Sequence, residues 1–216
     1  MSKSQAVSQG RKFSQVIRGA TAIFLRDGYA GASVDDIARA ANVSKATLYS
    51  YFPDKSRMFQ EAMRAEADRL DGGFTLDIPD DLHPRQAIPL MTARIAEWLA
   101  DPDRVRLYRI HVAEARRFAA LSANFHDRVL HIVHDAIRPY LVRWVQSGQL
   151  CIEDTRIAAE QLIALASAGL MDALLRDRQN FPSNSDIQAI SQSAAHLFLK
   201  AALPAPAELL LSAGSR

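Results

Sequence analysis

Apolar residues recur at helical spacing along most of this chain, and this periodicity limits the fold more than any other feature. In the first segment Phe13, Ile17, Ala20 and Phe24 fall at i, i+4, i+7 and i+11, which form one face of a helix. No stretch alternates apolar and polar residues convincingly, and no Asn-Gly pair marks a two-residue hairpin. The sequence therefore predicts an all-α fold.

The first part of the chain contains residues that typically begin and end helices. Gly28 can end the first helix by taking the left-handed conformation. Ser33 can cap a second helix, with Asp36 three residues later in a variant of the capping box. Ser44 can cap a third helix that runs to about Tyr51. The short connection between the second and third helices is typical of a helix-turn-helix.

Longer helices are predicted after Pro53. Asp54 can cap a fourth helix that reaches about Leu70. Residues 71–84 contain two glycines and two prolines and are expected to form a linker. The tail from Pro204 is expected to be loose. Between the linker and the tail, helices are predicted near 85–100, 103–118, 122–147, 155–178 and 185–202.

The net charge of +2 is distributed unevenly. Residues 1–64 contain ten basic and five acidic side chains, whereas the remaining residues contain 16 basic and 19 acidic ones. A basic N-terminal part favours a polyanion as its partner, although the same bias also occurs on ordinary solvated surfaces.

The single cysteine, Cys151, cannot form an internal disulfide, which favours a reducing compartment. The first residues lack the apolar core of a signal peptide. The longest apolar run, 162–171, is well short of the roughly 18 residues that a membrane span needs. We therefore expect a soluble, cytoplasmic protein with no membrane partner.

The third predicted helix lies within the stretch VSKATLYSYFPDKS, residues 43–56. Helical spacing turns Leu48 and Phe52 toward the core and leaves Lys45, Ala46 and Tyr49 on the opposite side. Lysine can reach a phosphate or guanine, and an exposed aromatic ring can pack on a sugar or a thymine methyl. The alternative is that Tyr49 and the nearby Tyr51 only cover a small core.

Between Gly28 and Met63 a set of small, apolar, aromatic and polar residues occurs at fixed spacing: Gly28-Tyr29, Ser33-Val34, Ile37-Ala38, Ala41, Val43-Ser44, Leu48-Tyr49, Tyr51-Phe52 and Lys55. On these residues the segment closely resembles the DNA-binding region of TetR/AcrR-type transcriptional regulators. One departure is Ala46, where the family commonly has glycine; both residues are small, so the helix can still approach DNA closely.

This resemblance implies two domains with different functions. Residues 1–53 would form a three-helix DNA-binding domain with a helix-turn-helix, joined by a connecting helix to a helical effector-binding and dimerisation domain, residues 54–203. The third helix would enter the major groove, while other residues hold the flanking phosphates. The implied DNA-binding residues are Ser33, Ser44, Lys45, Ala46, Thr47, Tyr49, Tyr51 and Lys55.

Binding to a double-stranded operator requires a homodimer, because one short recognition helix makes too few contacts for tight, specific binding. Family resemblance places the seam on the last two long helices, whose small residues permit close approach. The alternative for each residue is the core of the single chain. The predicted interface residues are Leu162, Leu165, Ala166, Gly169, Leu170, Ile190, Ala194, Leu197 and Phe198.

The helices between residues 85 and 147 would enclose a small organic effector, and residues 107–118 look like an AefR-like C-terminal domain. Aromatic and mixed-polarity residues in this region suit an apolar ligand held by a few polar groups, although each is also an ordinary core residue. The candidates are Trp98, Tyr108, His111, Phe118, Phe125 and Trp144.

Other functions receive less support. His131 and His134 lie near Asp127 and Asp135, but no cysteine pair accompanies them, so we expect no metal and no cofactor. The sequence has no phosphate-binding loop, dinucleotide fingerprint, nucleophile elbow or zinc-protease motif, and an enzyme would have to use dispersed residues such as Glu114. A helical adaptor would leave the Lys45 and Tyr49 face unexplained. The family resemblance favours a transcriptional repressor released by its effector.

Overall fold

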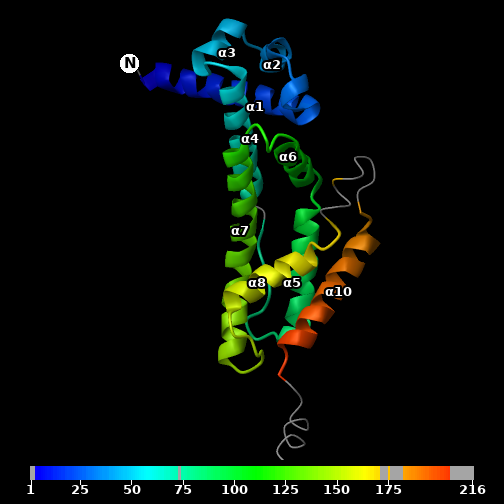
Figure 1. Ribbon diagram of the computed structural model, residues 1–216. Coiled ribbons are helices and arrows are strands. Elements are labelled where there is room, and N and C mark those ends of the chain that lie inside the picture. Colours follow the sequence, from blue (N-terminus) through cyan, green and yellow to red (C-terminus); the bar gives the residue numbers. More distant parts are fainter. Residues whose placement is uncertain (1–2, 73, 171–174, 176–181, 205–216) are drawn as a thin grey trace, which may run out of the picture. The chain divides into compact units, whose positions relative to one another are not determined.

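The computed structural model describes residues 3–72, 74–170, 175 and 182–204. Over these residues the regular secondary structure is entirely helical, which confirms the predicted all-α fold (Figure 1). The loose tail predicted from Pro204 falls almost wholly outside the described residues. The helices are α1 (Lys3–Gly31), α2 (Val34–Ala40), α3 (Lys45–Tyr51), α4 (Lys55–Asp71), α5 (Pro84–Leu99), α6 (Pro102–Ala113), α7 (Ala119–Gln146), α8 (Thr155–Ala166) and α10 (Asn184–Ala202).

The chain folds into two compact units. The first comprises Met1–Gly72 and Pro102–His126, and the second comprises Gly73–Asp101 and Asp127–Arg216. Helix α7 therefore contributes its beginning to the first unit and its remainder to the second. The predicted functional division after residue 53 stays a prediction; by packing, α4 belongs with α1 in the first unit.

Three predicted N-caps begin α2, α3 and α4. Ser33 Oγ accepts from the Asp36 backbone N–H at 3.0 Å, Ser44 Oγ from that of Thr47 at 3.1 Å, and an Asp54 carboxylate oxygen from that of Arg57 at 2.7 Å. Each cap satisfies a backbone donor that the first helical turn leaves unpaired. The capping box at α2 is only half formed, because the Asp36 carboxylate accepts from the Ser33 hydroxyl instead of from its backbone N–H.

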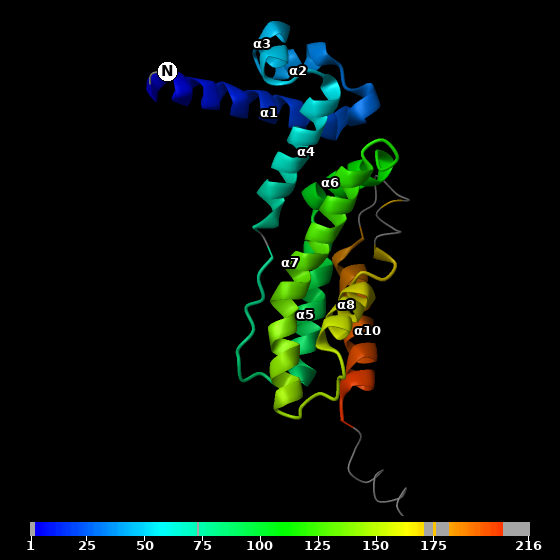
Figure 2. The ribbon, with the colours of Figure 1, turned by 60° about the vertical axis from the view of Figure 1, so that its left-hand side comes forward.

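Helix α1 forms the base of the first unit, and both α2 and α4 pack against it (Figures 1 and 2). Gly28 has a positive φ of 70°, as predicted, but it kinks α1 instead of ending it, and the helix continues to Gly31. Gly19 lies where α1 meets the end of α2: a Cβ added there would stand 2.6 Å from the backbone nitrogen and Cβ of Ala41. The two helices therefore touch without an intervening side chain.

The second unit contains α5, most of α7, α8 and α10. Helix α10 packs along α5 and also contacts α8 (Figure 2). Trp144 of α7 is almost fully buried, and its indole N–H donates to the Leu82 carbonyl at 3.2 Å. Tyr140, one turn earlier, reaches the Ile78 carbonyl at 3.4 Å. These bonds attach the segment before α5 to the side of α7.

One predicted helix is shorter than expected, and another is interrupted. The helix predicted to reach residue 118 ends at Ala113, and a turn then carries Phe118 onto the rings of Tyr29 and Phe59. The helix predicted over 155–178 first ends at Ala166, where Gly169 follows with φ 74°, a conformation that commonly ends a helix. Leu170 and Leu175 are helical again, and residues 171–174 and 176–178 lie outside the described residues. No helix among the described residues is long and apolar enough to cross a membrane.

Candidate functional site

Helix α3 has one buried and one exposed side, as the sequence predicted. Leu48 is fully buried and Phe52, its C-cap, is 2% exposed. On the other side Tyr49 is 49% exposed, and Lys45 and Ala46 are also exposed. A large ring half in water on a short helix is not part of the core, so Tyr49 is available to a partner.

Tyr51 differs from Tyr49 because it takes part in the packing of the first unit. Its ring meets Phe13 edge-on with centroids 5.8 Å apart, and Phe13 also lies 5.6 Å from Phe52. Tyr51 is half-buried. The core-covering role that the sequence left open therefore applies to Tyr51.

The N-terminus of α3 carries a compact set of polar groups. Ser44 Oγ lies 2.9 Å from Thr47 Oγ1, in addition to capping the helix. Lys45 Nζ lies 2.6 Å from a carboxylate oxygen of Asp35, in the first turn of α2. The hydrogen bond and the negative charge of Asp35 raise the pKa of Lys45. Sequence reasoning missed this pair; its only signal was an acid in the first turn of α2.

The predicted phosphate contacts are partly engaged inside the protein. The Ser33 hydroxyl donates to Asp36 at 2.8 Å, and the other Asp36 oxygen accepts from Arg39 at 2.7 Å. These contacts lower the pKa of Asp36, the Ser33 hydrogen bond most of all. Lys55 Nζ lies 4.8 Å from the centroid of the Tyr29 ring and 3.5 Å from the Ala30 carbonyl oxygen. Lys55 is therefore held at the edge of the first unit.

Comparison with known proteins identifies the family to which this chain belongs. The family described as "Bacterial regulatory proteins, tetR family" matches residues 16–62, and "AefR-like transcriptional repressor, C-terminal domain" matches residues 87–201, more than half of the chain. The chain belongs to the TetR family. The resemblance identified from residues 28–63 is thereby confirmed, as is the AefR-like character of the C-terminal part. The family is one of transcriptional regulators, in agreement with the expectation that the chain is not an enzyme.

Relatives of this TetR-family chain are similar over different lengths. The negative transcriptional regulator IcaR of the biofilm operon icaADBC in Staphylococcus aureus (strain Newman) is 33% identical over 57 residues, which cover 26% of this chain and 31% of IcaR. A TetR-family regulator from Mesorhizobium loti MAFF303099 shares the fold with a TM-score of 0.76 at 21% identity, covering 91% and 98% of the two chains. The flavonoid-responsive regulator FrrA has a TM-score of 0.69 at 28% identity, covering 91% and 100%.

The six predicted effector residues of the regulator divide between the two units. Trp98 and Trp144 lie in the second unit, where Trp98 meets Phe74 edge-on at 5.2 Å. In the first unit Phe118 joins the Tyr29 and Phe59 rings, and Tyr108 is half-buried on α6. His111 and Phe125 come together: their rings stack at 4.2 Å with an interplanar angle of 4°.

His111 is the most unusual polar residue of the first unit. It is 4% exposed, and neither of its ring nitrogens has a hydrogen-bond partner among the described residues. Burial lowers the pKa of His111 from 6.5 to about 4, because a charged imidazole would lose its hydration. The ring is therefore neutral at pH 7 and offers one unused donor and one unused acceptor.

The burial of His111 predicts a pH-dependent stability. The unfolded chain protonates this imidazole below about pH 6.5 and the folded chain only near pH 4, so the free energy of unfolding falls as pH decreases between these values. Urea unfolding of the wild type should show this loss, about 2 kcal/mol between pH 7 and pH 5 from this residue. His111→Phe keeps a ring against Phe125 and should remove that part of the dependence. An equal loss in both proteins would contradict the prediction.

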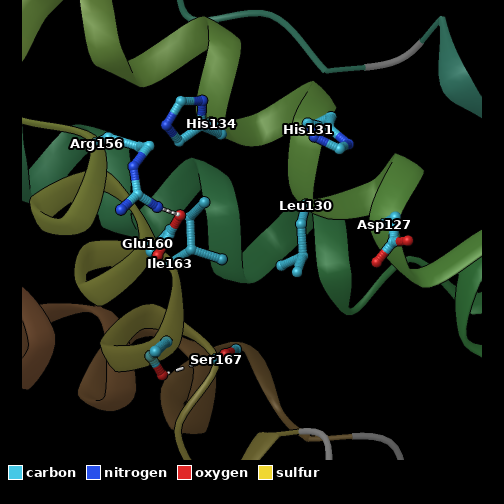
Figure 3. Close-up of a pocket in the computed structure, with 9 residues that line it drawn as sticks. Asp127, Leu130, His131, His134, Arg156, Glu160, Ile163 and Ser167 are labelled. Carbon is cyan, nitrogen blue, oxygen red and sulfur yellow. Dashed lines mark hydrogen bonds and ion pairs between the residues drawn. The ribbon is translucent and has the colours of Figure 1, made fainter. Parts of the chain in front are cut away.

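A hollow of about 620 Å³ lies between α7 and α8 in the second unit. Figure 3 shows Arg156 and Glu160 turned toward each other on α8, where Nη1 and Oε1 are 2.6 Å apart. Arg156 and Glu160 pair with each other, and Leu130 and His131 are exposed, so the hollow is open to solvent and is not an enclosed apolar site. The residues that line it are Asp127, Leu130, His131, His134, Arg156, Glu160, Ile163, Ala164 and Ser167.

The histidines considered as metal ligands lie on this hollow. His134 Nδ1 is 3.3 Å from an Asp135 oxygen, whereas His131 is exposed. Within the described part of the chain, no three His, Cys, Asp or Glu residues converge as a metal site would require.

The nine predicted dimer residues have two kinds of surroundings. Leu165 and Ile190 are half-buried, while Gly169 and Leu197 are exposed, Leu197 at 51%. The other five are buried within the single chain, so their side chains stabilise the packing of α8 and α10; they are Leu162, Ala166, Leu170, Ala194 and Phe198. Sequence reasoning missed Ile157, which is 42% exposed on the outer side of α8, although its apolar character next to Arg156 was a visible signal.

Proposed function

We propose that this TetR-family regulator binds a double-stranded operator as a homodimer through α3, represses transcription, and is released by a small organic effector. The observation that carries the proposal is the sidedness of α3, with Leu48 fully buried and Tyr49 49% exposed beside Lys45. A helix of this kind can enter the major groove while its other side remains attached to the protein. IcaR, of which this chain spans about a third, is named as a negative regulator, which favours repression.

In the proposed complex, base contacts come from Lys45, Ala46, Thr47 and Tyr49, and phosphate contacts come from residues at the edges of the first unit. The caps at Ser44 and Ser33 mark two helix N-termini, but Ser33 must exchange its Asp36 hydrogen bond for a phosphate. Tyr51 contributes by holding α3 against Phe13 and also lies at the phosphate edge. We place the protein in the cytoplasm, where its DNA is, and assign it no metal or cofactor.

The homodimer is supported by the outer surface of α8 and α10. Leu197 is 51% exposed and Ile157 42%, and the small residue Ala164 is also exposed on α8. Hollows lie on both sides of α8: one toward α7 and one toward α10. A ridge between two grooves can pack against its symmetry copy, and dimerisation presents two α3 helices to half-sites about 34–36 Å apart.

The effector is proposed to contact His111 and Phe125. The stacked rings supply an apolar surface, and the buried imidazole supplies a donor and an acceptor that no described residue engages. FrrA is flavonoid-responsive, and the Bacillus subtilis regulator FadR was solved with stearoyl-CoA, so organic effectors occur among the structural relatives. For this chain we propose an aromatic molecule carrying one hydroxyl or carbonyl.

We propose that the effector signal passes through the helix contacts of the first unit. Helix α6, which carries His111, packs against α4 and α1. Arg69 Nη2 of α4 lies 2.9 Å from a carboxylate oxygen of Asp103 on α6. The ring centroid of Phe118, just after α6, lies 5.0 Å from that of Tyr29 near the end of α1. An effector that binds the DNA-free arrangement more tightly would shift these contacts and lower operator affinity.

The function is tested by selecting bound duplexes from a random-sequence library and then measuring affinity across salt. A regulator should retain a defined, roughly palindromic sequence, and its affinity should fall steeply with salt because bound counterions are released. Failure to retain any duplex at low salt would overturn the proposal and favour an adaptor.

Two lysine variants should then behave differently. Lys45→Ala should relax base preference at one position of each half-site, because a base contact is lost. Lys55→Ala should weaken all duplexes alike and reduce the salt slope by about one per chain. Fluorescence anisotropy on the selected operator and on its single-base variants separates the two effects. Indistinguishable profiles would show that Lys45 reads no base.

A further inference from the structure

An acidic residue shares the surface from which α3 is proposed to read DNA. The Asp35 carboxylate lies 2.6 Å from Lys45 Nζ, and the two side chains are 62% and 54% exposed. Asp35 stands in the first turn of α2, while Lys45 is the first residue of α3. Such an exposed ion pair contributes little to folding stability, so it can be exchanged for other contacts when a ligand arrives.

The two kinds of DNA surface affect this pair differently. Phosphate oxygens only accept hydrogen bonds and are negatively charged, so Lys45 can bind them only where the Asp35 carboxylate is brought close to negative charge. Base edges in the major groove carry both acceptors for an ammonium group and N–H donors for a carboxylate. Contact with bases can therefore satisfy both members of the pair, whereas contact with the backbone satisfies one and repels the other.

The neighbouring acid does not duplicate this role. Asp36 accepts from the Ser33 hydroxyl and from Arg39, both on its own helix or cap. Asp35 instead reaches across to α3, and it holds the lysine proposed to contact bases. The charge on Asp35 is therefore linked to recognition and that on Asp36 to the start of α2.

We propose that Asp35 is a specificity-determining residue, which withholds Lys45 from the phosphate backbone and so disfavours binding to non-operator DNA. This inference rests on the proposed DNA-binding function. Without the Asp35 carboxylate, Lys45 is free to neutralise a phosphate on any sequence. The regulator then discriminates less between the operator and other DNA, although it keeps its base contacts.

The test compares the wild type with Asp35→Asn on two duplexes: the operator selected with the wild type and a random-sequence duplex of equal length. The variant should bind the random duplex about threefold to fivefold more tightly at low salt, as expected for one surface charge. Its salt slope on that duplex should steepen by about one per chain. Operator affinity should change less, so the ratio of the two affinities falls.

Control variants show whether a change in the affinity ratio comes from the charge of Asp35 and acts through Lys45. Asp81→Asn removes the same charge from an exposed position of the second unit and should leave the ratio unchanged. Asp35→Glu keeps the carboxylate and should restore most of the discrimination. In a Lys45→Ala background, Asp35→Asn should have little effect, because its action passes through Lys45. Circular dichroism checks that each variant is folded.

Several outcomes would overturn the inference. An unchanged affinity ratio in Asp35→Asn would do so, and so would an equal effect of this substitution with and without Lys45, which would indicate simple repulsion by Asp35. A loss of operator affinity larger than the gain on random DNA would assign Asp35 a positioning role instead. Failure of the wild type to bind any duplex is a different result, because it refutes the proposed function itself.

Discussion

Gly19→Ala is expected to destabilise the first unit and to abolish specific DNA binding. The added Cβ would lie 2.6 Å from both the Cβ and the backbone nitrogen of Ala41, at the end of α2. Neither atom can rotate away, so α1 and α2 must separate. Alanine gains about 1 kcal/mol of helix propensity over glycine, but overpacking a close contact typically costs about 1–3 kcal/mol or more. The steric cost should prevail.

The effect on DNA binding follows from the short path between the helices. Helix α2 packs on α1, and α3 packs on α2, so displacement of α2 moves the exposed face of α3. Gly10→Ala is the matched control, because the Cβ that it would add in the same helix meets no described atom within 4 Å apart from the helix's own backbone and chain neighbours. It should be neutral or slightly stabilising. Thermal unfolding and anisotropy on the selected operator measure both effects; equal behaviour of the two variants would refute the predicted clash.

Leu197→Glu should convert the proposed homodimer to a monomer and lower operator affinity by about 100-fold or more. Leu197 is 51% exposed on α10, within the surface proposed for the dimer seam. In the proposed seam the introduced carboxylate would be buried without a charge partner, which is costly. Once the dimer separates, the second recognition helix no longer binds at high effective concentration.

Leu90→Glu provides the matched control for this substitution. Leu90 is 53% exposed on α5 in the same unit, so the change in hydrophobicity, charge and exposure is nearly the same. Sedimentation velocity should detect a dimer for Leu90→Glu and a monomer for Leu197→Glu, and operator binding should follow the same division. A dimeric, fully active Leu197→Glu protein would show that this face of α10 does not form the dimer interface.

The local features of the sequence determined where most helices begin and which side of α3 faces the core. Caps and turn glycines act within a few residues: Ser33, Ser44 and Asp54 each bond a backbone N–H three positions later, and Gly28 adopts its positive φ. The separation of Leu48 from Tyr49 likewise follows from helical spacing alone. These features could be read without the rest of the chain.

Only the tertiary structure decided contacts between residues far apart in the chain. Asp35 and Lys45 meet across two helices, and His111 becomes buried against Phe125 with no hydrogen-bond partner in the part of the chain that the structure describes. The apolar pattern of α8 and α10 also could not tell residues buried in the chain, such as Leu162, from those left on its surface, such as Leu197. Periodicity gives the direction of a side chain around its own helix, whereas burial and pairing depend on which neighbouring helix occupies that direction.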